Sequence, residues 1–349
     1  MSKTMDLFDS RVPAVDPGDI IGFTSLGEPI RAVAGSARAT FESWIPIDFG
    51  SDVITKVRQT SAIEAYAQRV PMTTQTKSTP RSGGMGVSLV AKGAAYGEDT
   101  TANDEVILRV QKFGSVARIA EEDIDDSLAN IIDTKTVDWA TSYAKALDNA
   151  CLGVSVARGT SLCAFDSVYY QLTQADAATG YTANSNITVS GTGGTTYDAL
   201  SGVLGQAETG DYWDEAEMIV MAHPSFKKKF RGIKDSTGSP ILQESSNGSP
   251  GGAQAPTADR LFGHQVHWTL GARKSTTVTS APTGNPLLFI ANRQLLLLGV
   301  RSGPETVLID GKDGAAALTD ESLLKMRSRR GFALGHPAAV SCFEDSTGV

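Results

Sequence analysis

Cysteine and histidine are scarce in this chain of 349 residues, which limits the metal and redox chemistry open to it. The three cysteines, Cys151, Cys163 and Cys342, lie far apart and form no CxxC pair, so neither a disulfide framework nor a zinc ribbon is expected. His264 and His267 would point to opposite faces of a strand, which disfavours a shared metal ion. No serine stands in a nucleophile-elbow sequence. The sequence therefore predicts no enzyme, no cofactor and no metal site.

Long apolar runs and a surplus of positive charge are also missing. The longest apolar stretches, Leu287 to Ala291 and Leu295 to Leu298, are separated by three polar residues, so neither a membrane span nor a secretion signal is expected. The formal net charge of −8 argues against a protein that coats nucleic acid, because neutralising phosphates requires a basic surface. The apolar fraction of 41% is ample for a globular protein, and the length favours two domains.

The most informative stretch runs from Pro71 to Phe113 and is typical of a long β-hairpin. Its expected strands are residues 87–91 and 106–110, with Pro80 and several glycines as breakers. An isolated two-stranded hairpin is only marginally stable in water, so another surface has to support it. A second copy of the chain is the favoured support, and an ordinary hairpin folded back on its own domain is the alternative.

The segments on either side of the hairpin differ in character. Residues 1–57 contain scattered Pro, Gly, Asp and Ser with few apolar clusters, which is typical of an arm that lies on neighbouring molecules. Residues 51–70 are expected to pass from a short helix into a strand that contains Ile63, Ala65 and Ala67.

Residues 120–152 are predicted to form the longest helix of the chain. One stripe is apolar and the other side is polar, with Asp148 on the polar side. The expected core residues of this helix are Leu128, Ile132, Trp139, Tyr143 and Leu147. The acidic cluster at its start, which includes Glu121 and Glu122, complements the helix dipole. A calcium loop is disfavoured because the central glycine is absent.

The sequence pattern of the second half of the chain predicts an α/β region. Residues 153–196 are small and polar, with a loop or edge hairpin expected at residues 183–196, and residues 244–258 form the clearest flexible loop. The expected helices are residues 197–207 and 224–233, and the expected strands are residues 218–222, 266–270, 287–300 (two strands that meet near Asn292) and 323–343.

The sequence contains two clusters of positive charge, one on a predicted helix and one on a predicted strand. One cluster is a basic helix face formed by Lys227, Lys228, Lys229, Arg231 and Lys234. Contact with nucleic acid is the more specific hypothesis for this face, and a solvated face or a pairing surface between subunits is the favoured one. Lys325, Arg327 and Arg329 point to one side of a strand, which suits ion pairs with a neighbouring acidic surface. Charged residues of the hairpin, of the long helix and of the closing strand are the expected assembly contacts: Lys77, Arg81, Lys92, Arg118, Glu121, Glu122, Lys325, Arg327 and Arg329.

The order of these elements resembles the major capsid protein of tailed bacteriophages, the Hong Kong phage type of fold. Each motif is weak alone, but together they cover roughly residues 50–345 in the family's order. The motifs are SAIEAYAQRVP (61–71), ARIAEEDIDDS (117–127), DNACLG (148–153), MAHPSFKKKFRGIKDSTGSPIL (221–242), LFGHQV (261–266) and RRGFALGHPAA (329–339).

The resemblance implies an α+β capsid fold with an N-terminal arm (1–57), an extended hairpin loop (73–111), a peripheral domain with a spine helix (58–72, 112–152 and 292–349) and an inserted axial domain (153–291). It implies a structural subunit of an icosahedral virion capsid, assembled as hexamers and pentamers in the host bacterial cytoplasm around double-stranded DNA that is contacted non-specifically. Portal, scaffolding and cementing proteins are the implied partners, with no membrane. A bacterial nanocompartment shell and a soluble two-domain α/β enzyme remain the alternatives.

Some relatives weld their shells through a lysine of the extended loop and an asparagine of a neighbour. Lys77 and Lys92 are available in this loop, but residues 293–349 contain no asparagine, and Asn292 has no recognisable carboxylate partner. A noncovalent shell is therefore expected.

Overall fold

A computed structural model describes residues 20–23, 29–31, 57–98, 103–126, 130–160, 163–191, 194–233, 260–309 and 321–347. The chain divides into two units, Met1–Asp52 and Val53–Val349. In the first unit, strands β1 (Ile20–Phe23) and β2 (Pro29–Arg31) pair antiparallel. The rest of the predicted arm up to residue 56 lies outside the described residues, as do Leu128, Lys234 and the predicted flexible loop 244–258.

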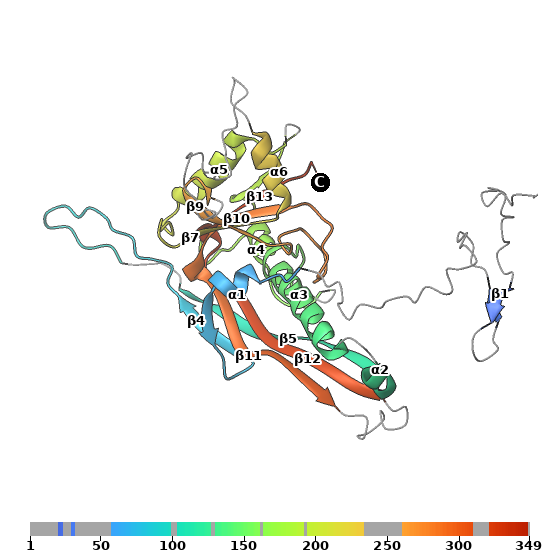
Figure 1. Ribbon diagram of the computed structural model, residues 1–349. Coiled ribbons are helices and arrows are strands. Elements are labelled where there is room, and N and C mark those ends of the chain that lie inside the picture. The colour runs from blue at the N-terminus through green and yellow to red at the C-terminus, as the bar shows by residue number, and fades with distance from the viewer. Residues whose placement is uncertain are drawn as a thin grey trace, which may run out of the picture. The chain divides into compact units, whose positions relative to one another are not determined.

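The second unit contains a five-stranded sheet in which long strands run side by side (Figure 1). Its order is β3 (Gln68–Pro71), β11 (Leu296–Ile309), β12 (Glu321–Leu334), β5 (Asp104–Ala120) and β4 (Thr76–Arg81). All neighbours are antiparallel except β3 and β11, which are parallel. The short strands β3 and β4 pair only with one end of their partners, so the rest of the sheet extends beyond them.

The second unit also contains a six-stranded sheet. Its order is β6 (Ile187–Val189), β13 (Val340–Glu344), β10 (Leu287–Asn292), β7 (Met218–Ala222), β9 (His264–Trp268) and β8 (Arg260–Leu261). Strands β7, β10 and β13 are buried throughout, because one face packs against helices α5 (Tyr197–Glu208) and α6 (Ser225–Gly232) and the other joins the main core. The closing strand β13 thus lies among strands of residues 187–292, and a domain boundary at residue 292 does not separate the two sheets.

The main core lies around helix α3 (Ile131–Leu152), which Figure 1 shows running along the five-stranded sheet. Asn130 caps the helix by accepting the backbone N–H of Asp133 at 3.1 Å. The helix ends at Gly153, where a Cβ atom would lie 2.0 Å from the carbonyl oxygen of Arg273. Helix α4 (Val168–Thr173) buries Val168 and Leu172 in the same core.

Several local predictions are confirmed. Helix α5, strand β7 and the two strands that meet at Asn292 stand where the sequence placed them, with the short helix η2 (Arg293–Leu295) at the junction. Strand β12 alternates buried and less buried residues as predicted, and it is followed by the short helix η4 (Pro337–Ala339) before β13. Helix α6 begins directly after Pro224, its N-cap residue.

Other local predictions are wrong. Strand β5 pairs with the polar segment β4, and residues 82–98 form no regular element, so residues 87–91 are not a strand. The segment with Ile63 and Ala65 is helix α1 (Ala62–Tyr66), capped by Ser61, because its apolar pattern fits both periods. The predicted helix 120–152 is interrupted: α2 (Glu121–Asp126) is separate from α3. In the small, polar region 153–196, helix α4 was not predicted, whereas β6 is an edge strand of the six-stranded sheet within the segment 183–196 predicted as a loop or edge hairpin.

Within the part of the chain that the structure describes, no helix is both long enough and apolar enough to cross a membrane.

Candidate assembly surfaces

The loop that joins β4 to β5 carries four of the five most exposed large apolar side chains of the described residues. The exposed fractions are 77% for Met85, 100% for Val87, 102% for Leu89 and 86% for Tyr96. Figure 1 shows this loop projecting away from the two sheets. Contiguous apolar exposure of this kind marks an interaction site, since a soluble monomer gains nothing from it.

An ion-pair cluster at Arg81 fixes the root of this loop. The guanidinium donates to Asp104 at 2.7 Å, to Asp176 at 2.9 Å and to the carbonyl of Gly335 at 3.1 Å. Its hydrogen bond holds the pKa of the Asp104 carboxyl below the usual value. Arg81 was predicted as an assembly contact, but within one chain it joins β4, β5 and the loop after α4.

The two loop lysines predicted as assembly contacts lie in different places. Lys77 stands on β4 and donates to the carbonyl of Pro71 at 3.3 Å. Lys92 is exposed in the projecting loop. Asn292, the candidate amide for a lysine, is 7% exposed, donates to the carbonyl of Tyr212 at 3.0 Å and caps η2. Its side-chain amide is therefore buried and hydrogen-bonded within the chain.

The predicted core stripe of the long helix is confirmed in its second half. Leu147 is fully buried and Tyr143 is 6% exposed. Trp139 and Ile132 are half-buried, and the Trp139 ring stacks on Tyr143 at 5.1 Å between centroids. The stripe thus faces the five-stranded sheet through Trp139 and the main core through Leu147.

Asp148 was predicted on the polar side of this helix, and that prediction is wrong. Its side chain is fully buried and accepts hydrogen bonds from the hydroxyls of Ser61 and Thr269 and from the backbone N–H groups of Ala62 (2.9 Å) and Ile63 (3.2 Å). Burial raises the pKa of Asp148, and the four donors oppose that rise. One carboxylate thereby joins α3, the start of α1 and the segment after β9.

Asn149 performs a similar role beside it. Its Nδ2 donates to the carbonyls of Gly271 (3.2 Å) and Arg273 (2.9 Å), and its Oδ1 accepts from Ser275 (2.9 Å) and from the backbone of Thr279 (3.3 Å). The helix ends in the run DNACL, whose residues are small or apolar on every side of the helix. This composition indicates burial on every side and is the sequence signal for Asp148 and Asn149.

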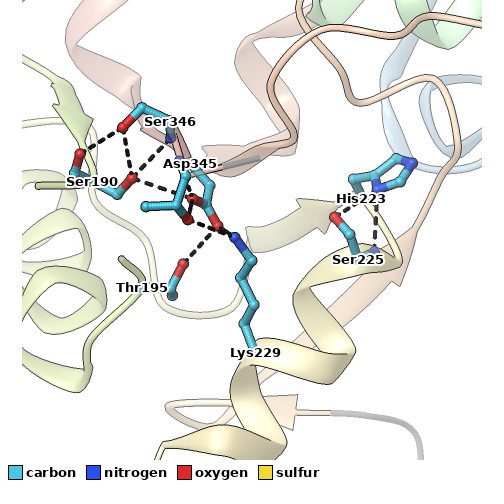
Figure 2. A network of polar contacts seen from close by, with 8 residues as sticks. Ser190, Thr195, His223, Ser225, Lys229, Asp345 and Ser346 are labelled. Atoms are coloured by element: carbon cyan, nitrogen blue, oxygen red, sulfur yellow. Dashed lines mark hydrogen bonds and ion pairs between the residues drawn. The ribbon is translucent and has the colours of Figure 1, made fainter. Parts of the chain in front are cut away.

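A second buried carboxylate, Asp345, binds the basic helix α6 to the end of the chain. Figure 2 shows Lys229 of α6 reaching Asp345, which is fully buried and also accepts from Thr195 (3.0 Å) and Ser190 (3.3 Å). Lys227 lies over the ring of Trp268 at 4.7 Å. Two lysines of the predicted basic face therefore make contacts within the chain, while Lys228 is exposed.

His223 and Ser225, also drawn in Figure 2, serve the start of α6. The ring Nδ1 lies 3.1 Å from the backbone nitrogen of Ser225 and 2.8 Å from its hydroxyl, while Nε2 lies 3.2 Å from Nε of Arg273. A neutral ring carries one N–H, so only one of the two ring nitrogens accepts a hydrogen bond. Burial, assisted by the Arg273 charge, lowers the pKa of His223 to about 4. A neutral ring held by contacts with Ser225 and Arg273 has a structural task.

The two histidines of β9 have aromatic partners on different elements. His264 meets Trp213 edge-on at 5.5 Å, and His267 stacks on Tyr66 at 3.6 Å. Among the described residues, no group of three or more His, Cys, Asp or Glu side chains could hold a metal ion.

The cations of β12 lie on one face, as predicted. Residues 322, 324, 326 and 328 are buried, so Lys325, Arg327 and Arg329 point the other way. Arg327 pairs with Glu305 at 2.9 Å, and Arg118 of β5 pairs with Glu321 at 3.4 Å. These pairs lie within one chain. Glu122 of α2 is exposed; the side chain of Glu121 is not described.

A buried arginine next to this set was missed. Arg330 is 6% exposed, pairs with Glu64 at 2.7 Å and donates to the carbonyl of Ser302. Tyr143 donates to the same Glu64 at 3.1 Å. In the sequence Arg330 looks like one more cation of a basic run, and only its place on the buried side of β12 distinguishes it.

Comparison with known proteins identifies the family to which the chain that carries these surfaces belongs. The model of the phage capsid family matches residues 43–344. The chain belongs to this family. This capsid protein is 22% identical over 236 residues (67% of this chain and 68% of the relative) to the "Probable major capsid protein gp17" of Mycobacterium phage L5. It is a structural protein, a major capsid subunit, which confirms the family resemblance and the predicted structural role.

Solved structures share the fold of this capsid protein. A chain from Mycobacterium phage Bobi gives a TM-score of 0.65 at 15% identity and covers 87% of this chain and 97% of that one. A chain from the capsid of a native GTA particle gives a TM-score of 0.63 at 14% identity, with coverage of 90% and 99%. The mixed α+β architecture is thus that of capsid subunits.

Proposed function

We propose that this capsid protein builds an icosahedral shell of hexamers and pentamers that encloses double-stranded DNA and assembles in the host bacterial cytoplasm. The observation that carries the proposal is the projecting loop 82–98. Its four large apolar side chains are 77–102% exposed, and burying one such side chain contributes about 1.5–3 kcal/mol. Repeated over a closed shell, such contacts add up, because each new subunit is held at several sites at once.

The proposed domain arrangement follows the two sheets. The five-stranded sheet with α3 would form the peripheral domain, and the loop from β4 to β5 would be the extended hairpin loop. The six-stranded sheet would form the inserted axial domain, with β13 included because it pairs with β10 and β6. Residues 1–57 would act as the arm.

The proposed partners are other copies of the chain, a portal, a scaffolding protein and, in the finished particle, a cementing protein. Packaged DNA would be contacted non-specifically. An acidic chain suits that task, since a wall that bound DNA tightly would oppose its release.

Electron microscopy of the purified full-length protein tests this proposal. We expect closed shells or free capsomers, because the apolar loop needs a neighbour. A monomer at micromolar concentration, seen both in micrographs and by size-exclusion chromatography, would contradict the proposed function.

The shell is expected to be held without covalent bonds between subunits. The closing segment 293–349 lacks asparagine, and the Asn292 amide is buried and hydrogen-bonded. Mature particles boiled in denaturant with reductant should run as a single band near 36.7 kDa. A ladder of multimers would show that another side chain forms a bond with Lys77 or Lys92.

A further inference from the structure

One face of the five-stranded sheet carries a strip of cations with nothing from the described residues packed over it. In an antiparallel sheet, residues directly opposite each other share a face. Lys325 lies opposite Val116, Arg329 opposite Lys112, and Leu323 opposite Arg118. We call the face formed by Lys112, Val116, Arg118, Lys325, Arg327 and Arg329 the cationic face.

This face is open, whereas the opposite face of the same strands is covered. Ile119, Leu324 and Met326 are buried against residues of α3 and α2. On the cationic face, Val116 is 55% exposed and the Arg118 side chain is 72% exposed. This face is therefore open to solvent in the single chain, and its charged side chains are accessible.

The cationic face has more positive than negative groups. Its carboxylates are Glu321, which pairs with Arg118, and Glu305, which pairs with Arg327. Lys325 also acts on Glu305 and, after Arg327, lowers the pKa of that carboxyl. Lys112 and Arg329 add two further exposed cations. A complementary partner must therefore bring negative charge.

The chain itself supplies such a partner at the same end of the sheet. Helix α2 (EEDIDD) follows β5 directly, and Figure 1 shows it at the end of the sheet where β5 ends and β12 begins. Ile124 packs toward the sheet core, while Glu122 and Asp123 are exposed. Within one molecule Ile124 packs on the covered side, so the exposed carboxylates of Glu122 and Asp123 are available to another molecule.

Duplex DNA is the other polyanion that a capsid subunit meets, and it fits this face less well. Val116 and Val307 offer apolar surface that phosphates do not use, and Glu305 and Glu321 would repel them. The net charge of −8 also means that copies repel one another unless a cationic surface of one meets an acidic surface of the next.

We propose that helix α2 of a second copy docks on the cationic face. The proposal rests on the proposed function, since it names one contact of the assembled shell. Because α2 and the cationic face lie at the same end of one sheet, copies arranged around an axis near that end can each give a helix and receive one. Such a head-to-tail contact closes into a ring.

Charge reversal tests the pairing. The double variant Lys325→Glu/Arg329→Glu and the double variant Glu122→Lys/Asp123→Lys should each lower the yield of particles by about tenfold or more at roughly 0.15 M salt, because like charges then face each other across the contact. The variant with all four changes should recover most of the wild-type yield. The matched control Lys228→Glu/Glu215→Lys reverses exposed charges elsewhere and should assemble normally.

Each outcome decides the matter. Normal assembly of both double variants, beside normal wild type and control, overturns the inference and leaves the proposed function intact. Failure of the four-change variant to recover shows that α2 is not the partner. If the double variants form full shells that no longer retain DNA, the cationic face binds nucleic acid instead of helix α2. If the wild type itself forms no particles, the proposed function fails.

A chemical cross-link tests the contact without reversing a charge. Particles made from equal amounts of Lys325→Cys and Glu122→Cys chains, treated with a bifunctional maleimide, should give covalent dimers on a denaturing gel. The native cysteines Cys151, Cys163 and Cys342 are buried and should not react. Particles of either single variant should remain monomeric on the gel, and an absence of dimers from the mixed particles would overturn the proposal.

Discussion

Replacing Asp148 by alanine is expected to lower the free energy of unfolding by about 3–5 kcal/mol, which is the range for removing one partner of a fully buried charged network. The carboxylate is the common acceptor for Ser61, Ala62, Ile63 and Thr269, and without it these donors stay buried and unsatisfied. Chemical denaturation of unassembled subunits measures the effect. The control Asp138→Ala, on the same helix but less buried, should change stability by no more than about 0.5 kcal/mol.

The variant Asp148→Asn adds a pH test. Because burial raises the pKa of Asp148 above its usual 3.8, the native state binds the proton more tightly than the unfolded state. The stabilisation from this proton is complete below the unfolded pKa and is lost as pH rises through the native one. The stability of the wild type relative to Asp148→Asn should therefore fall with rising pH across that window, and a pH-independent difference would contradict the expected shift.

Replacing residues 84–97 by a short Gly-Ser linker is expected to abolish shell formation while the subunit stays folded. The change keeps β4, β5 and the Arg81–Asp104 pair and removes residues that are all exposed except the half-buried Val90. Burial of each large apolar side chain on a neighbour contributes about 1.5–3 kcal/mol, and the variant loses this contribution at every contact. Electron microscopy should show no particles, and thermal melting should match that of the wild-type subunit.

A full-length control separates loop length from loop chemistry. Serine at Met85, Val87, Leu89 and Tyr96 keeps the length and removes the apolar groups, and it should give the same assembly defect. Normal particles from this variant would show that the backbone of the loop, and not its apolar side chains, holds the neighbour.

Sequence periodicity predicted the elements in which the pattern of burial stays the same from one end of the element to the other. The run MIVMA is buried on both sides in the middle of a sheet, and β12 alternates because one side faces the core. The pattern of the polar segment TKSTPR does not predict a strand, because Pro80 is typical of a strand breaker. In an edge strand such as β4, however, the missing N–H of proline is harmless.

By itself the sequence determined the class of this protein. The order of arm, hairpin, long helix, α/β region and closing strand, with no catalytic set, indicated a capsid subunit, and the family match confirms it. Only the tertiary structure decided which charged residues are available to other copies. Arg81, Lys229 and Arg330 look like surface cations in the sequence, yet each is satisfied within the chain by a carboxylate at least 23 residues away. Composition and periodicity describe local environment, whereas ion pairs between distant segments depend on how the chain folds back on itself. Strand alternation separates Lys325 and Arg329 from Arg330, but only the tertiary structure brings Arg330 to Glu64, 266 residues away in the sequence.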